Sequence, residues 1–374
     1  MHTELSSWVE VDYRAIRANY AVLKRTISPA KVWAVVKGNA YGHGMIGVAQ
    51  ALQDDAAGFV VANGSDALEL RKAGISQPIL VVGWVDPHSV SELALNKIEV
   101  AAFSSANTKE LEQALVNTTV PLRVHLKVET GLGRLGFPPL EISRIKESPH
   151  LWVVGIYSHF ASVEEANLTH SQAQLDRFAA SRVKSGHPVA RHMASTASAL
   201  LLPEARFDFV RVGIGLYGLW PSPEIRALVK KKFGKLPNLT PALSWKARLI
   251  HIGEVGKGGY VGYGCSFRAA RPTRVGVVAL GYAQGLPRSY AQGGVMIVNG
   301  QRAPIIGRIC MDMTMLDLTD CTAVKPGAIV TIIGRDAKEE ITADEMAKVL
   351  GTINYELVTR IPSTTVRISK EQYV

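Results

Sequence analysis

A lysine closes an apolar run and is followed at once by glycines and polar side chains in residues 35–44, Val-Val-Lys-Gly-Asn-Ala-Tyr-Gly-His-Gly. The run from Val32 to Val36 is β-branched and aromatic enough for a buried strand, so we expect Lys37 at its buried end. Burial disfavours the ammonium form and makes the amine a nucleophile toward an aldehyde. A strand-end lysine can also simply extend its amine into solvent. The chemical role is favoured by the polar residues beside it, Asn39, Tyr41 and His43.

Two arginines are candidates for the same site. Residues 128–136, Val-Glu-Thr-Gly-Leu-Gly-Arg-Leu-Gly, form a glycine-rich loop that carries Arg134. A guanidinium suits a phenolate or carboxylate because its charge is permanent and its donors form a fixed fork, although a loop arginine can equally be a surface residue. Arg211 lies inside the apolar run 209–213, where burial is costly unless other groups accept its hydrogen bonds.

Short apolar runs alternate with segments of helical spacing between residues 32 and 213. One such segment is Ser65–Ala73, with Ser65 as a candidate N-cap. The pattern predicts a (β/α)₈ barrel, with a doubly wound open sheet as the alternative. Polar and glycine-rich residues after several strand ends favour the barrel. The eight expected strands are Val32–Lys37, Gly58–Ala62, Ile79–Gly83, Glu99–Phe103, Leu122–Val128, Val153–Ser158, Val189–Met193 and Phe209–Gly213.

From about Lys235 the chain changes to short, valine-rich runs broken by glycine, which predicts a mainly-β domain. One helix is expected at Ala343–Leu350, after a capping box formed by Thr342 and Glu345. We therefore expect a barrel domain at 1–235 and a β domain at 236–374, with residues 1–11 free to pair with the β domain. Expected strands of the β domain include Thr273–Gly281, Val295–Val298 and Ala328–Gly334.

Composition is that of an ordinary globular protein and excludes several classes. The net charge of +10 invites nucleic-acid binding, but the one compact basic run, Lys230–Lys235, has no interleaved aromatics and is interpreted as a solvated linker. Three cysteines are too few for a disulfide framework or a zinc site, and no metal is expected. We find no signal-peptide pattern or membrane-spanning stretch, so the cytoplasm is the expected location.

Residues 35–44 resemble, position by position, the pyridoxal-phosphate attachment motif of alanine racemases, a family with a barrel and a β domain. The resemblance extends from Trp8-Val9-Glu10-Val11-Asp12 to Tyr355. It implies that Lys37 holds pyridoxal 5'-phosphate as a Schiff base and that Tyr41 contacts the phosphate. It also places Arg134 at the phenolic oxygen and the substrate carboxylate.

Further barrel residues receive roles by the same resemblance. Arg211 is assigned to the pyridine nitrogen, which it would leave unprotonated, and His159 would link Arg211 to a tyrosine. Lys127 matches a lysine that the family often carries as a carbamate. The residues assigned to the phosphate are Ser195, Thr196, Gly213, Ile214 and Tyr355. The family commonly has Asn-Ser where this chain has Ser195-Thr196, so the amide is lost and one hydroxyl is kept.

Removal of a proton from one face and its return to the other needs a second base. Val261-Gly262-Tyr263-Gly264 resembles the family segment that carries it, which assigns that role to Tyr263. The resemblance further implies that backbone at Met311 holds the substrate carboxylate and that Tyr282 narrows the entrance. It implies a head-to-tail homodimer with composite sites. Gln284 replaces an expected Asp at the entrance.

The resemblance implies racemisation of L- and D-alanine for peptidoglycan. Three other functions stay open at this point. The chain could be a racemase for serine or a broader range of amino acids, or a decarboxylase of the same architecture, which Arg211 opposes because decarboxylation gains from a protonated pyridine. It could also be a cofactor carrier, which would have no need of Tyr263.

Overall fold

The computed structural model describes residues 5–145, 148–163, 165 and 167–370 of the chain. The chain divides into two compact units. One comprises Ala15–Tyr41 and Met45–Pro241, and the other comprises Met1–Arg14, Gly42–Gly44 and Ala242–Val374.

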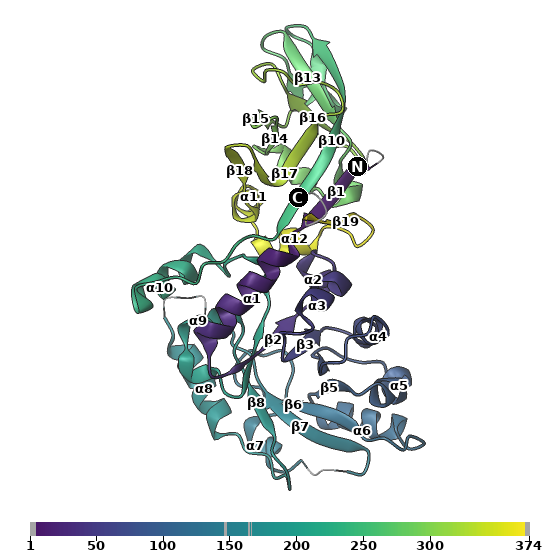
Figure 1. Cartoon of the computed structure of the whole chain (residues 1–374), viewed down its shortest axis with the longest axis vertical. Helices are drawn as coiled ribbons and strands as arrows, with labels where there is room; N and C mark the ends of the chain where they lie inside the picture. The colour runs from purple at the N-terminus through teal and green to yellow at the C-terminus, as the bar shows by residue number, and fades with distance from the viewer. Residues whose placement is uncertain (1–4, 146–147, 164, 166, 371–374) are drawn as a thin grey trace. The chain divides into compact units, whose positions relative to one another are not determined.

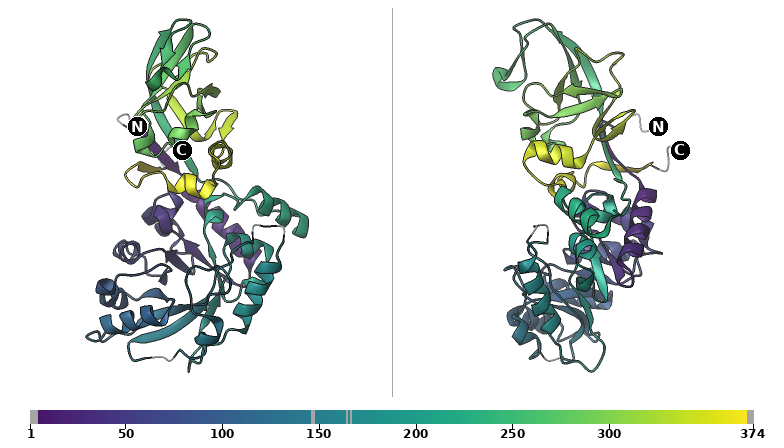
Figure 2. Two further views of the ribbon diagram at one scale, coloured as in Figure 1. Left: turned by 180° about the vertical axis from the view of Figure 1, so that it is seen from behind. Right: turned by 90° about the vertical axis from the view of Figure 1, so that its left-hand side faces the viewer.

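Eight parallel strands of the first unit form a nearly closed barrel, and the open-sheet alternative is wrong (Figures 1 and 2). Their order is β8-β7-β6-β5-β4-β3-β2-β9. The ring is completed by Asp208 N, which donates to Arg191 O at 3.1 Å, and Arg211 N, which donates to Ala194 O at 2.9 Å. All eight predicted strands are present, with ends that differ from the predicted ones by at most two residues: β2 (Lys31–Val35), β3 (Gly58–Val61), β4 (Ile79–Val81), β5 (Ile98–Ala102), β6 (Leu122–Lys127), β7 (Leu151–Tyr157), β8 (Ala190–His192) and β9 (Phe209–Val212).

Helices and short helical turns connect the strands. They are α1 (Tyr13–Ile27), α2 (Lys37–Tyr41), α3 (Met45–Leu52), α4 (Gly64–Lys72), α5 (Val90–Leu95), α6 (Ser105–Ala114), α7 (Pro139–Ile142), α8 (Thr169–Ala180), α9 (Thr196–Leu201) and α10 (Pro223–Phe233). The predicted N-cap of α4 is wrong. Asn63, and not Ser65, accepts the backbone N–H of Asp66, at 2.8 Å.

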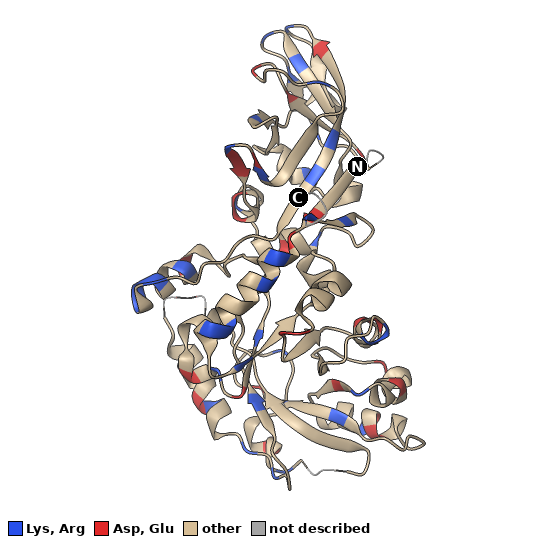
Figure 3. Cartoon of the chain, viewed as in Figure 1, with Lys and Arg blue, Asp and Glu red and all other residues tan. Residues whose placement is uncertain are grey.

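The basic run is part of a helix, and the linker interpretation is wrong. Lys230, Lys231 and Lys232 form the last turn of α10, and the Lys230 ammonium donates to Gly234 O at 2.8 Å. Cations at a helix C-terminus are stabilised by the helix dipole. Figure 3 shows the remaining Lys and Arg spread over many elements of both units.

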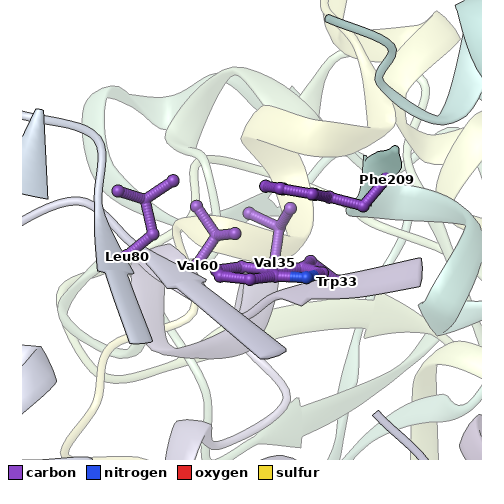
Figure 4. Close-up of a cluster of buried hydrophobic side chains, with 5 residues drawn as sticks. All are labelled: Trp33, Val35, Val60, Leu80 and Phe209. Atoms are coloured by element: carbon purple, nitrogen blue, oxygen red, sulfur yellow. The ribbon is translucent and has the colours of Figure 1, made fainter. Parts of the chain in front are cut away.

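A cluster of buried hydrophobic side chains lies in the barrel, formed by Trp33, Val35, Val60, Leu80 and Phe209 (Figure 4). Trp33 of β2 stacks on Phe209 of β9 with ring centroids 4.3 Å apart and meets the edge of His125 on β6. Because one side chain touches strands from different parts of the ring, it must lie inside it. A Cβ on Gly58 would stand 2.6 Å from the Trp33 ring, so this glycine makes room for the indole.

The second unit is a mainly-β structure around a nine-stranded sheet with order β15-β14-β17-β10-β1-β19, to which β13, β16 and β18 are joined at its side. The N-terminal strand β1 lies in this sheet, antiparallel to β10 and parallel to β19. Its strands are β1 (Ser7–Val11), β10 (Leu243–Val255), β13 (Thr273–Val278), β14 (Val295–Val298), β15 (Gln301–Pro304), β16 (Thr314–Asp317), β17 (Ile329–Asp336), β18 (Glu339–Ile341) and β19 (Val366–Ser369).

Smaller elements complete this unit: β11 (Tyr260–Val261), β12 (Phe267–Arg268), α11 (Ala343–Leu350) and α12 (Asn354–Thr359). The predicted helix at Ala343–Leu350 is confirmed, and Thr342 caps it by accepting the N–H of Glu345 at 3.0 Å. Within the described part of the chain, no helix is both long and apolar enough to cross a membrane.

Candidate active site

Lys37 stands where β2 gives way to an unusual backbone turn. The strand ends at Val35, so the prediction that Lys37 is the last, buried residue of the strand is wrong, and its side chain is exposed. Gly38, Asn39, Ala40 and Tyr41 all have φ between 52° and 62°. A left-handed conformation costs a non-glycine residue about 1–2 kcal/mol, and such strain is typical of functional sites. The turn is held by Ala40 N, which donates to Val36 O at 2.8 Å.

Four cationic side chains, those of Lys37, Lys127, Arg134 and Arg211, lie at this end of the barrel, and the charges of all four act on His159. Partial desolvation and the charges of Arg134 and Arg211 lower the pKa of Lys37. Burial and the same two guanidinium groups lower the pKa of Lys127 to about 8. Since Lys127 ends β6 and is buried, its lowered pKa leaves part of its amine neutral near pH 7.

Arg211 of β9 is the most constrained member of this group. Its Nη2 donates to Ser158 O at 2.8 Å, to Met193 O at 3.1 Å and to His159 Nδ1 at 3.2 Å. Its Nη1 lies 2.5 Å from His192 Nδ1. The guanidinium also lies over the Tyr157 ring at 5.2 Å. These acceptors explain how an arginine is tolerated inside a buried strand, as the sequence required.

Arg134 is carried by a loop that Glu129 folds. The Glu129 carboxylate accepts backbone N–H groups of Gly131 at 2.5 Å, Leu132 at 2.7 Å and Arg134 at 3.2 Å. Burial would raise the pKa of Glu129, but these backbone donors outweigh it and hold that pKa below its usual range. The Arg134 side chain stays exposed, and its charge acts on Lys37, Lys127 and His159.

A second group of predicted residues meets beside the lysine. Gly213 N donates to Thr196 Oγ1 at 3.2 Å, and Ile214 follows in a 3₁₀ turn, Ile214–Tyr217. A Cβ on Gly213 would stand 2.3 Å from the Tyr41 hydroxyl. The Ser195 hydroxyl instead lies 3.3 Å from that of Ser198. The structure thus brings Tyr41, Thr196, Gly213 and Ile214 together and turns Ser195 toward α9.

Gly213→Ala is expected to weaken binding of an anion that uses the Tyr41 hydroxyl, because the new methyl would displace that hydroxyl. Loss of one hydrogen bond to a charged group costs about 1.5–3 kcal/mol, so we expect about a tenfold or larger rise in the dissociation constant of pyridoxal phosphate. Titration followed by absorbance measures it. Gly186→Ala is the matched control because no atom lies within 4 Å of its new methyl. Equal affinities for the two variants would contradict this placement.

His159 follows β7 and is surrounded by positive charge. Burial, together with Arg211, Arg134, Lys37 and Lys127, lowers its pKa to about 3. Arg211 donates to its Nδ1, so its proton is on Nε2. The imidazole is therefore neutral at every physiological pH.

The lowered pKa of His159 makes a pH-dependent contribution to stability. Between pH 6.5, the ordinary pKa of histidine, and about pH 3, His159 binds a proton in the unfolded chain but not in the folded protein. The free energy of unfolding should fall over this interval, by up to about 1.4 kcal/mol per pH unit for this one group. His159→Asn should make the fall shallower between pH 6.5 and 4.5, measured by urea unfolding. Identical slopes in both proteins would show that His159 does not titrate in this way.

The remaining predicted residues belong to the β unit. Tyr263 follows β11, and 69 % of its surface is exposed; Tyr282 and Met311 are also exposed. Their loops adjoin, since Tyr282 N donates to Cys310 O at 3.1 Å and Ala283 N to Met311 O at 2.9 Å. A Cβ on Gly264 would stand 2.8 Å from Arg308 Nη1, so the loop that carries Tyr263 lies beside the segment that carries Arg308. Tyr355 lies in α12.

Several buried polar residues of the barrel were missed by the sequence reasoning. They are Glu99, His125, Thr130, Tyr157, Ser158, Gln174 and His192. Gln174 of α8 donates to Thr130 Oγ1 and His159 O, and so ties the Arg134 loop to the end of β7. The available signal was a histidine within each of two expected strands, at 125 and 192, where a polar side chain needs a partner.

The residues present fit a small polyanionic cofactor. Several described groups exert their charge on Lys37, Lys127, His159 or Arg211. Glu129 is the one carboxylate among them, and backbone N–H groups donate hydrogen bonds to it. A group of cations with so little negative charge beside it favours the binding of an anionic ligand. Fold and site together define a barrel protein with a cationic site beside a lysine at the ends of its strands.

Comparison with known proteins identifies the family. Residues 11–221 match the model of the alanine racemase N-terminal domain, and residues 242–369 match that of the C-terminal domain. The chain belongs to the alanine racemase family.

Relatives match along nearly the whole chain. "Alanine racemase 1" of Clostridium acetobutylicum is 36 % identical over 96 % of this chain and 94 % of its own length. The alanine racemase of Methanococcus maripaludis is 36 % identical over 96 % of this chain and 98 % of its own. The crystal structure of alanine racemase from Bacillus anthracis with bound L-Ala-P is 36 % identical, with a TM-score of 0.89. The match covers 97 % of this chain and 95 % of that one.

Proposed function

We propose that the protein is a cytoplasmic, pyridoxal-phosphate-dependent alanine racemase that interconverts L- and D-alanine and supplies D-alanine for peptidoglycan. The observation that carries the proposal is the group of four cations that includes the accessible Lys37, next to Tyr41, Thr196 and Gly213. The proposal needs a cofactor that carries a phosphate and a phenolate and a substrate that carries a carboxylate. The cationic group matches that combination of charges.

Each binding residue has a part in this proposal. The Lys37 amine would hold the cofactor covalently, and its lowered pKa favours the neutral, nucleophilic form. The phosphate would be received by Tyr41, Ser195, Thr196, Gly213, Ile214 and Tyr355. Arg134 would bind the phenolic oxygen and the substrate carboxylate, aided by backbone at Met311.

Arg211 would face the pyridine nitrogen, beside His159. When bound, pyridoxal phosphate supplies an electron-withdrawing ring that makes the α-proton of an amino acid acidic. A guanidinium only donates hydrogen bonds, so the ring nitrogen would stay unprotonated and the electron withdrawal would stay moderate. Moderate withdrawal favours proton exchange over decarboxylation.

Two groups would move the α-proton. Lys37 takes it from one face, and Tyr263 of the partner subunit serves the opposite face. The support for a partner is the exposure of Tyr263 at 69 %, Met311 at 56 % and Tyr282 at 43 % on adjoining loops. Large apolar side chains gathered on a surface are typical of interfaces. A head-to-tail homodimer would bring these loops to the barrel of the other copy, with Tyr282 at the entrance.

Gln284, where an Asp is expected, and Lys127, which matches a lysine of the family, both bear on this site. Gln284 Nε2 donates to Asp312 Oδ1 at 2.8 Å, and its Oε1 accepts Gly281 N at 2.9 Å. The amide thus keeps the loop in place while it removes the charge that an Asp would bring. Lys127 is proposed as a carbamate, because a pKa of about 8 makes its neutral amine available to carbon dioxide.

A chiral assay across alanine, serine and larger amino acids tests the substrate. We expect the highest kcat/KM for alanine and loss of activity with increasing side-chain size. A higher kcat/KM for serine would replace the proposal with serine racemisation. Bound cofactor without turnover of any amino acid would indicate a carrier.

A further inference from the structure

A line of hydrogen-bonded side chains runs inside the barrel away from the proposed cofactor site. Arg211 of β9 meets His192 of β8, whose Nε2 lies 2.9 Å from His125 Nδ1 on β6. His125 Nε2 in turn lies 2.8 Å from Glu99 Oε2 on β5. Glu99 also accepts from Arg123 at 2.8 Å.

The two ends of the line fix every proton in it. A guanidinium can only donate, so Arg211 requires His192 Nδ1 as an acceptor, and the His192 proton is on Nε2. That proton points at His125 Nδ1, which must accept, and the His125 proton is therefore on Nε2, toward Glu99. A proton on His125 Nδ1 would make His192 Nε2 the acceptor and move the His192 proton to Nδ1, where its N–H would face the guanidinium.

The line also joins a buried cation to a buried anion. Arg211, His192, His125 and Glu99 are 6 %, 0 %, 2 % and 4 % exposed. Both carboxylate oxygens of Glu99 accept a hydrogen bond, Oε2 from His125 Nε2 at 2.8 Å and Oε1 from Arg123 at 2.8 Å, and these donors favour the ionised carboxylate. Arg123 is less enclosed, with 37 % of its side chain exposed.

The surrounding residues hold the two imidazoles in this arrangement. His192 stacks on Phe209 at 4.1 Å and on Tyr157 at 5.0 Å. Gly155 stands opposite His125 in the β6–β7 ladder, and a Cβ there would lie 2.1 Å from His125 Nδ1. The glycine is thus required for the ring to lie across the neighbouring strand.

We propose that Glu99 is the counter-charge of Arg211, acting through neutral His125 and His192, and that these three side chains are positioning residues which hold the guanidinium toward the ligand. Opposite charges linked by polarisable, directed hydrogen bonds stabilise each other in a medium of low dielectric constant. The orientation of Arg211 toward a pyridine ring rests on the proposed function, whereas the charge coupling does not.

The proton positions are tested by ¹⁵N NMR of the purified full-length protein labelled at histidine. His125 and His192, assigned from His125→Gln and His192→Gln variants, should both be neutral with the proton on Nε2 at pH 7.5. A cationic signal for either ring, or a proton on Nδ1 of His192, would overturn the proposal.

The charge coupling is tested by a double-mutant cycle on the midpoint of thermal unfolding. Glu99→Gln keeps an acceptor for His125 and removes only the charge. We expect it to lower the midpoint in the wild-type background and to do so by less than half as much when Arg211→Gln is also present. Arg123→Gln is the control, with the same effect in both backgrounds. Equal effects of Glu99→Gln in both backgrounds would overturn the proposal.

A third readout connects the line to the ligand. Glu99→Gln should raise the dissociation constant of pyridoxal phosphate about tenfold, equivalent to about 1.4 kcal/mol, while Arg123→Gln leaves it unchanged. Equal affinities would refute the positioning role. Because the NMR and unfolding results do not depend on racemase activity, failure of this inference and failure of the proposed function can be distinguished.

Discussion

Lys37→Ala is expected to abolish racemisation, with a loss of at least about a thousandfold in kcat, because both covalent attachment and one proton transfer are lost. Lys37 is the accessible lysine of the cationic group, and its pKa is lowered by desolvation, Arg134 and Arg211. A chiral assay of the purified variant measures the loss. Borohydride reduction of the wild-type protein with pyridoxal phosphate should leave a stable label on Lys37, located by peptide mass spectrometry.

Lys127 provides the matched control for the attachment point. It is also a lysine with a lowered pKa, about 8, and the same two guanidinium groups act on it. Lys127→Gln should still be labelled at Lys37 after reduction, and Lys37→Ala should not be labelled at Lys127. A label on Lys127 in the wild-type protein would contradict the assignment.

Tyr263→Phe is expected to lower kcat for racemisation by about a hundredfold to ten-thousandfold, the range for loss of a general acid–base group. The cofactor label on Lys37 should remain, because the barrel is untouched. Lys37 still serves one face, so the α-proton of one enantiomer should continue to exchange with heavy water while inversion stops. NMR of alanine incubated with the variant measures both.

Tyr260→Phe is the control for this variant. Tyr260 lies in β11, three positions before Tyr263, and is also exposed, at 54 %. Its hydroxyl has no part in the proposed chemistry, so racemisation should be unchanged. Near-normal turnover by Tyr263→Phe, or an equal loss in both variants, would remove Tyr263 from the mechanism.

The sequence predicted correctly those features that can be recognised from a residue and its neighbours in the chain. Buried parallel strands are continuous apolar runs, so the eight barrel strands could be recognised, and functional groups of such barrels follow the strand ends. Arg211 stood out because a charged residue interrupts one of those runs. The N-cap of α4 was harder to locate, since Asn63 and Ser65 are both good caps only two positions apart.

The sequence could not show what depends on strand register or on backbone conformation. His125 meets His192 and Glu99 only because β5, β6, β7 and β8 pair as they do. The left-handed turn after Lys37 includes Asn39, Ala40 and Tyr41, of which only Asn commonly adopts it. That turn ends the strand early and leaves the lysine accessible, in contrast to the burial expected from the apolar run.

Exchange of the α-proton in heavy water tests two-base racemisation of alanine most directly. Wild-type protein with pyridoxal phosphate is incubated separately with L- and D-alanine, and deuterium in each enantiomer is followed by chiral chromatography and mass spectrometry. We expect inversion from either starting enantiomer, with α-deuterium appearing in both. Inversion without deuterium incorporation, or exchange in one enantiomer without inversion, would contradict the account.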